Sequence, residues 1–135
     1  MADRFTPEER SRIMARIKGK NTKPEILVRR LLHRMGYRFR IHGTKLPGKP
    51  DIVLPRHHKI VFVHGCFWHG HDCKRGTRAA SNAEFWNEKI EGNKIRDERK
   101  RKELEALNWT VLTVWECETK NVERLADRLR KFMES

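Results

Sequence analysis

Three cysteines and one histidine form the pattern with the most specific chemistry in this chain. Cys66, His71 and Cys73 lie within eight residues, and Cys117 directly follows a separate apolar segment. Thiolates and an imidazole suit tetrahedral Zn²⁺, and four protein ligands leave no open coordination position, so the ion would be structural. The alternative is three separately buried cysteines and a surface histidine, and His69 is a competing ligand that spacing alone does not exclude.

A second group combines carboxylates with histidines near the ends of predicted strands. Asp51 opens one strand, His64 ends the next, and His69 follows His64 after five residues. An aspartate in this position can bind a hard cation such as Mg²⁺ beside a phosphate, and either histidine could act as a general base on a water. For Glu25, in the first turn of a predicted helix, the local sequence favours a capping role. Asp97 lies on a charged helix, where a solvated side chain is typical.

Large aromatic side chains lie close to both groups. Phe67 and Trp68 are adjacent in a glycine-containing loop, where the two cannot easily both face a core. In a basic protein they are candidates for stacking on bases or wedging between them, and Trp86 could either join them or pack in the core. Trp109 and Trp115 lie in an apolar strand and are predicted to be core residues.

The elements that must position these residues follow from helix-start signals and hydrophobic periodicity. The expected helices span residues 6–17, 22–35, 81–107 (interrupted at 92–93) and 121–133, and the expected strands span 37–42, 51–54, 59–64 and 109–115. The apolar stripe of the last helix is expected to contain Val122, Leu125, Leu129 and Phe132. If the strands that end at His64 and Trp115 are neighbours, the cysteines that follow them can meet.

Length and charge limit the class of protein. The 135 residues predict a single α/β domain with a mixed sheet, and no apolar run is long enough to span a membrane. The absence of a secretory signal predicts a cytoplasmic protein, and the lack of a heptad pattern favours a monomer. The net charge is +13, of which +8 falls in residues 1–40, where 12 basic residues face 4 acidic ones. This excess predicts a polyanionic partner such as DNA.

Several ordered motifs resemble the very short patch repair (Vsr) endonuclease family over residues 8–132. The most specific is His64-Gly65-Cys66-Phe67-Trp68-His69; the others are the segments 47–53, 84–86, 93–97 and 114–117. The resemblance implies a restriction-endonuclease-like mixed β-sheet flanked by helices, with a structural zinc site. It also implies Mg²⁺-dependent nicking of double-stranded DNA 5′ to the thymine of a T·G mismatch left by 5-methylcytosine deamination. Mismatch-repair proteins would be possible partners, and the nucleoid the expected location.

The resemblance also implies individual roles. Asp51 and the main-chain carbonyl of Val63 would bind Mg²⁺, although the family has threonine where this chain has Val63. His69 would be the general base, oriented by Asp97, while Glu25 and His64 would hold metal-bound waters and the phosphate. The implied zinc ligands are Cys66, His71, Cys73 and Cys117. The implied intercalating residues, which enter from the major groove, are Phe67, Trp68 and Trp86. The basic N-terminal arm, residues 1–20, would contact the minor-groove side.

Two other functions remain compatible with parts of this pattern. A non-catalytic, zinc-stabilised DNA-binding module would need the zinc ligands and the basic arm but not Asp51. A related restriction or nicking endonuclease acting on paired DNA would use the same catalytic groups without a mismatch wedge. A zinc deaminase is disfavoured, because no His-x-Glu motif accompanies a Cys-x-x-Cys motif.

Overall fold

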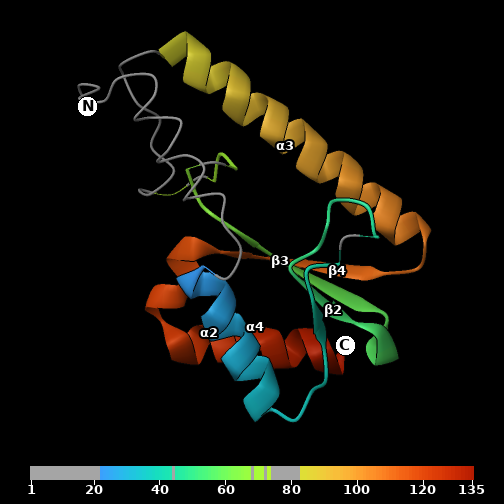
Figure 1. Cartoon of the computed structure of the whole chain (residues 1–135). Coiled ribbons are helices and arrows are strands. Elements are labelled where there is room, and N and C mark those ends of the chain that lie inside the picture. Colours follow the sequence, from blue (N-terminus) through green and yellow to red (C-terminus); the bar gives the residue numbers. More distant parts are fainter. Residues whose placement is uncertain (1–21, 44, 68, 72, 74–82) are drawn as a thin grey trace.

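The computed structural model describes residues 22–135 except residues 44, 68, 72 and 74–82 (Figure 1). The helix expected over 6–17, the arm over 1–20 and the side chain of Trp68 lie outside the described residues. The helices are α2 (Lys23–Arg34), α3 (Ala83–Ala106) and α4 (Val122–Glu134), with the 3-10 helices η1 (Pro55–His57) and η3 (Glu116–Lys120). The strands are β1 (Arg40–Ile41), β2 (Ile52–Leu54), β3 (Lys59–His64) and β4 (Thr110–Trp115).

The four described strands form one mixed sheet in the order β1-β2-β3-β4. The β1–β2 and β2–β3 pairs are antiparallel, whereas β3 and β4 are parallel and joined by a crossover that contains α3. In the parallel pair, His64 lies opposite Trp115. The predicted neighbourhood of these two strands is therefore confirmed, and the residues that follow both strands start from the same edge of the sheet.

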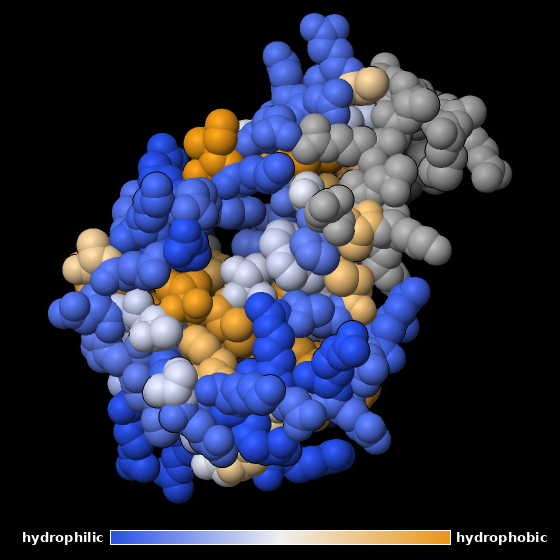
Figure 2. Space-filling model, turned by 180° about the vertical axis from the view of Figure 1, so that it is seen from behind, coloured by the Kyte–Doolittle hydropathy of each residue, from blue (hydrophilic) through white to orange (hydrophobic). Residues whose placement is uncertain are grey.

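Helices cover both faces of the sheet (Figure 1). Helices α2 and α4 pack on one face, where Leu32, Ile52, Val61 and Leu129 belong to one buried cluster. Helix α3 lies on the other face, where Leu104 packs with residues of β2 and β3. Viewed from behind, most of the surface is hydrophilic, and one group of hydrophobic side chains is visible near the middle of this face (Figure 2). No helix in the described part of the chain is long and apolar enough to cross a membrane.

The first of these helices begins as its sequence predicts. The Thr22 hydroxyl accepts a hydrogen bond from the Glu25 N–H at 3.4 Å, and Pro24 occupies the first turn, where its missing N–H costs no helical bond. Gly36, with φ +90°, follows the C-cap in the left-handed conformation that glycine adopts without strain. Helix α2 is thereby fixed at both ends, and Glu25 is held in its first turn.

Three expectations about the elements are wrong. The strand expected over 37–42 is reduced to Arg40–Ile41; His42 adopts a left-handed φ of +54° and leaves the regular strand, although its N–H still donates to the Asp51 carbonyl. Helix α3 runs through 92–93 without interruption, since one glycine costs a helix only about 1 kcal/mol. In α4, Val122 is 44% exposed, and Met133 joins Leu125 and Leu129 in the buried stripe instead.

Candidate active site and metal centre

The parallel register of β3 and β4 brings the distant cysteines together. Cys66 follows the end of β3 and Cys117 follows the end of β4, and the Cys117 N–H donates to the Cys66 sulfur at 3.4 Å. One ligand atom from each of Cys66, His71, Cys73 and Cys117 lies within 4.8 Å of the others. The four residues singled out by sequence therefore form one cluster at the sheet edge.

This cluster has the spacing of a tetrahedral metal centre. The Cys117 sulfur lies 3.6 Å from Nδ1 of His71, while a regular Zn²⁺ site with Zn–S bonds of about 2.3 Å separates its ligand atoms by roughly 3.8 Å. Burial raises the pKa of the Cys66 thiol to about 12, so a metal-free Cys66 keeps its proton and a bound cation must displace it. The residues present fit a soft divalent cation such as Zn²⁺.

Trp115 lies against the metal-binding cluster rather than in the core. Its ring stacks on that of His71 with centroids 4.2 Å apart and an interplanar angle of 12°, and it meets the His64 ring edge-on at 5.5 Å. The prediction that Trp115 is a core residue is therefore wrong: it belongs to neither hydrophobic cluster of the described residues, and together with His71 it lines a neighbouring cleft. Trp109, at the start of the same segment, packs against the α3 face of the sheet, as predicted.

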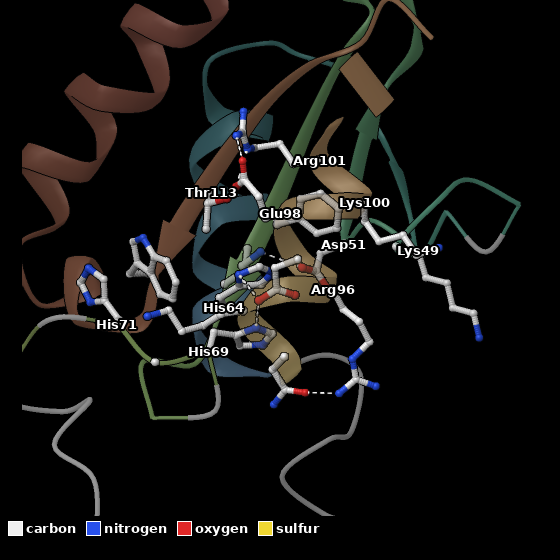
Figure 3. Close-up of a pocket in the computed structure, with 18 of the residues that line it drawn as sticks. Lys49, Asp51, His64, His69, His71, Arg96, Glu98, Lys100, Arg101 and Thr113 are labelled. Carbon is white, nitrogen blue, oxygen red and sulfur yellow. Dashed lines mark hydrogen bonds and ion pairs between the residues drawn. The ribbon is translucent and has the colours of Figure 1, made fainter. Parts of the chain in front are cut away.

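A cleft of about 900 Å³ lies between α3 and the sheet, beside His71 of the cysteine–histidine cluster (Figure 3). Its lining includes Asp51, His64, His69 and Asp97. These side chains come from the start of β2, the end of β3, the loop after β3, and α3. Four of the five predicted catalytic residues thus meet in one cleft.

Asp51 is a partly buried carboxylate next to the end of β3. Its Oδ2 accepts a hydrogen bond from the Val63 N–H at 2.7 Å. Burial raises the pKa of Asp51 from 3.8 to about 6; the Val63 hydrogen bond opposes this shift, and the nearby Glu25 carboxylate adds to it. A cation bound at Asp51 would offset this repulsion by the Glu25 carboxylate.

Val63 meets Asp51 through its backbone, since its N–H donates to Oδ2 of Asp51. The N–H and C=O of one strand residue point to roughly the same side, so the Val63 carbonyl is expected on the side where Asp51 meets Val63. The donors present, a carboxylate and a carbonyl, suit a hard cation such as Mg²⁺.

The structure distinguishes between the two histidines. Nδ1 of His69 lies 2.6 Å from Oδ2 of Asp97, whereas Nδ1 of His64 lies 3.9 Å from the same oxygen. Donation from Nδ1 to Asp97 leaves Nε2 of His69 as the basic nitrogen, as in other acid–histidine pairs. Burial, with His69 stacked at 3.8 Å, lowers the pKa of His64 to about 3, so His64 stays neutral. Asp97 contacts His69 and is not the solvated residue that its helix sequence suggests.

Glu25 lies near Asp51 but does not line the cleft. It is buried, and its Oε2 accepts a hydrogen bond from Nη2 of Arg29 at 3.0 Å. The same Nη2 lies 3.2 Å from Nε2 of His42, whose backbone N–H donates to the Asp51 carbonyl. The sequence analysis missed Arg29 and His42; the i,i+4 spacing of Glu25 and Arg29 could have identified the first, but no local signal identifies the second.

Phe67, Phe85 and Trp86 form one group of aromatic rings. The rings of Phe67 and Trp86 meet edge-on at 5.4 Å, and Phe85 meets Trp86 at 5.1 Å. Phe85 is 47% exposed, which is unusual for so large an apolar side chain. The structure therefore brings two of the three predicted intercalating residues together, and the third, Trp68, falls on an undescribed position.

Comparisons with known proteins agree with this geometry. The family described as DNA mismatch endonuclease Vsr matches residues 2–75. Type II nicking enzyme V.XorIIP of Xanthomonas oryzae pv. oryzae is 48% identical over 134 residues, which cover 99% of this chain and 98% of that enzyme. Type II nicking enzyme V.NmeAIP of Neisseria meningitidis serogroup A is 46% identical over 133 residues, 98% of this chain and 95% of the other.

A third relative carries the family's name. DNA mismatch endonuclease Vsr of Escherichia coli is 41% identical over 127 residues, which cover 94% of this chain and 81% of the E. coli protein. Similarity of this degree along nearly the entire chain identifies an endodeoxyribonuclease and argues against a non-catalytic DNA-binding module. The chain belongs to the Vsr family of DNA mismatch endonucleases.

Proposed function

We propose that this enzyme uses Mg²⁺ to nick one DNA strand 5′ to the thymine of a T·G mismatch left by deamination of 5-methylcytosine. The observation that supports it best is that the Asp51 carboxylate and the His69–Asp97 pair line one cleft. Phosphodiester hydrolysis needs charge neutralisation at the phosphate and a base for the attacking water. This cleft has residues for both tasks in a member of a mismatch endonuclease family.

Each catalytic residue has a defined task in this proposal. Asp51 and the Val63 carbonyl hold Mg²⁺, which when bound polarises the phosphate and stabilises the leaving oxygen. Nε2 of His69 takes the proton of the attacking water, and Asp97 stabilises the resulting imidazolium through Nδ1. His64, kept neutral by burial, can hydrogen-bond the phosphate, and Glu25 attracts the waters of the hydrated cation.

The cysteine cluster has a structural task. Zn²⁺ held by Cys66, His71, Cys73 and Cys117 would tie the loop after β3 to the end of β4. His69 lies inside that loop, so the zinc site would hold the general base near Asp97. We extend the proposal to a single domain of restriction-endonuclease-like fold over residues 1–135, with residues 1–20 as a DNA-contacting arm.

We expect the aromatic group to supply mismatch selectivity. Replacing Trp86 with alanine should reduce the preference for T·G over T·A duplexes about tenfold, because wedging side chains enter a mismatched step at lower cost. The measurement is kcat/KM for nicking each duplex. Trp109→Ala is the matched control, since Trp109 stacks on His58 away from the cleft, and it should leave the ratio unchanged. An unchanged ratio for Trp86→Ala would assign Trp86 a packing role.

A strand-resolved nicking assay tests the proposed function. Duplexes with T·G or T·A at one position, in several methyltransferase-site contexts and labelled on each strand, are incubated with and without Mg²⁺. The proposal expects a Mg²⁺-dependent nick 5′ to the mismatched thymine alone. A second candidate is nicking of paired DNA, because the Xanthomonas and Neisseria relatives are named nicking enzymes and their names mention no mismatch. Equal cutting of T·A and T·G duplexes would support that candidate and reject mismatch selectivity.

A further inference from the structure

The cleft carries more positive charge than its proposed chemistry uses. Five cationic side chains line it: Lys49, Lys94, Arg96, Lys100 and Arg101. Three have carboxylate partners on α3: Arg101 pairs with Glu98 and Glu105, Lys100 reaches Glu103 at 3.4 Å, and Lys94 reaches Glu91 at 4.0 Å. Such pairing reduces the attraction of a cation for a further anion.

Lys49 and Arg96 differ from the other three. Among the residues that the structure describes, no carboxylate pairs with either side chain. Arg96 donates instead to Oδ1 of Asn93 at 2.5 Å and to the Gly92 carbonyl at 3.3 Å, and both acceptors are uncharged. The guanidinium is therefore oriented while its charge remains uncompensated. Both Lys49 and Arg96 are exposed, so both can reach an anionic ligand.

Lys49 and Arg96 both lie on one side of the proposed reaction centre. Figure 3 shows Lys49 and Arg96 on the side of Asp51 opposite His71. Lys49 is only two residues before Asp51, and Arg96 directly precedes Asp97 on α3. The cleft thus has acids and histidines at its centre, and at one end cations that no carboxylate of the described residues pairs with.

The backbone at Lys49 is held in place. Gly48 has a φ of +76°, and a Cβ there would lie 3.0 Å from Cβ of Lys100 and 3.2 Å from the Phe62 ring. Lys49 itself has a φ of +48°, and its N–H donates to the Leu46 carbonyl. This turn therefore packs directly on α3 and the sheet, and it fixes the base of the Lys49 side chain relative to Asp51.

We propose that Lys49 and Arg96 form a phosphate-binding subsite for the nicked strand, taking a phosphodiester next to the one that is cut. The proposal rests on the proposed function, because it requires a DNA strand in this cleft. Phosphates follow one another every 3.4 Å or so of axial rise along a strand, so a strand whose scissile phosphate lies at Asp51 presents another phosphate to this end of the cleft. Lys49 and Arg96 are positioning residues, since neither touches the reacting atoms.

The first test separates binding from chemistry. In single-turnover nicking of T·G duplex, Lys49→Ala should raise the half-saturating enzyme concentration roughly tenfold and leave the maximal rate within about twofold. The salt dependence of binding should lose about one unit of slope per phosphate contact. Lys45→Ala removes a charge from the same loop without altering the cleft lining and is the matched control. For Arg96→Ala the matched control is Arg99→Ala, because Arg99 lies on the same helix but does not line the cleft.

The second test locates the phosphate. Neutral methylphosphonates replace, one at a time, the phosphates on either side of the scissile one, and each duplex is assayed with wild type and Lys49→Ala. At one position, the neutral methylphosphonate should weaken DNA binding by the wild-type enzyme about tenfold. The same substitution should hardly weaken DNA binding by the Lys49→Ala variant. The subsite would be overturned if, at every position, the methylphosphonate and Lys49→Ala weakened DNA binding additively. It would also be overturned if Lys49→Ala lowered only the maximal nicking rate. Wild type nicking paired and mismatched duplexes equally would overturn only the proposed mismatch selectivity, because both tests can be run on paired DNA.

Discussion

Replacing Asp51 with asparagine is expected to lower the maximal nicking rate at least about 10³-fold, equivalent to roughly 4 kcal/mol of transition-state stabilisation. The asparagine would retain the size of the side chain but lose the charge that binds a divalent cation. The loss should appear in single-turnover nicking of T·G duplex at saturating enzyme, so that weaker DNA binding does not contribute. Raising the Mg²⁺ concentration should restore only a small part of the rate.

Folding of the Asp51→Asn variant supplies an independent check. The pKa of Asp51 is raised to about 6, above its ordinary 3.8, so the folded state disfavours the ionised carboxylate. That group's contribution to stability is present below about pH 4 and is lost as the pH rises through 6. Without Mg²⁺ at pH 8, the variant should therefore be more stable than wild type by about 1–3 kcal/mol in urea. Asp127→Asn, at an exposed position on α4, should change neither activity nor stability appreciably.

The same raised pKa makes the metal requirement depend on pH. Below about pH 6 a proton occupies Asp51 in the metal-free enzyme, and the cation must displace it. The Mg²⁺ concentration for half-maximal nicking should therefore rise about tenfold per pH unit below 6 and level off above 7. A requirement that is constant from pH 5 to pH 8 would exclude Asp51 as the metal-binding carboxylate.

Replacing Cys117 with serine is expected to remove the structural metal and to destabilise the fold by at least about 3 kcal/mol. Serine keeps the size of the side chain but is a poor ligand for Zn²⁺. The loop after β3 would then no longer be tied to the end of β4, and His69 would lose its position beside Asp97. Metal content by elemental analysis and unfolding in urea measure the two effects.

Two comparisons identify the cause of such a loss. A mild chelator that removes Mg²⁺ should stop nicking but leave zinc bound, near one ion per chain, and the fold intact. Restoring Mg²⁺ should restore activity in wild type but not in Cys117→Ser. A zinc-free Cys117→Ser protein with wild-type stability would show that the cysteine cluster does not stabilise the fold.

The local sequence was enough to identify the candidate metal ligands, several helices and strands, and the family of this enzyme. The spacing of Cys66, His71 and Cys73 identified a candidate metal-binding cluster, because a single short loop holds all three. The apolar runs of β3 and β4 identified the strands, and the helix-start signal at Thr22 identified α2, since these features depend on neighbouring residues alone. The Vsr motifs then identified the family without any knowledge of distances.

Only the tertiary structure decided which groups interact. His64 and His69 are equivalent candidates in the sequence, and the distance to Asp97 separates them. Only folding brings Asp97 on α3 to His69, and Arg29 on α2 to His42. Folding likewise stacks Trp115 on His71. Position along the chain does not determine such contacts, because the pKa, orientation and partners of a side chain depend on what packs around it after folding.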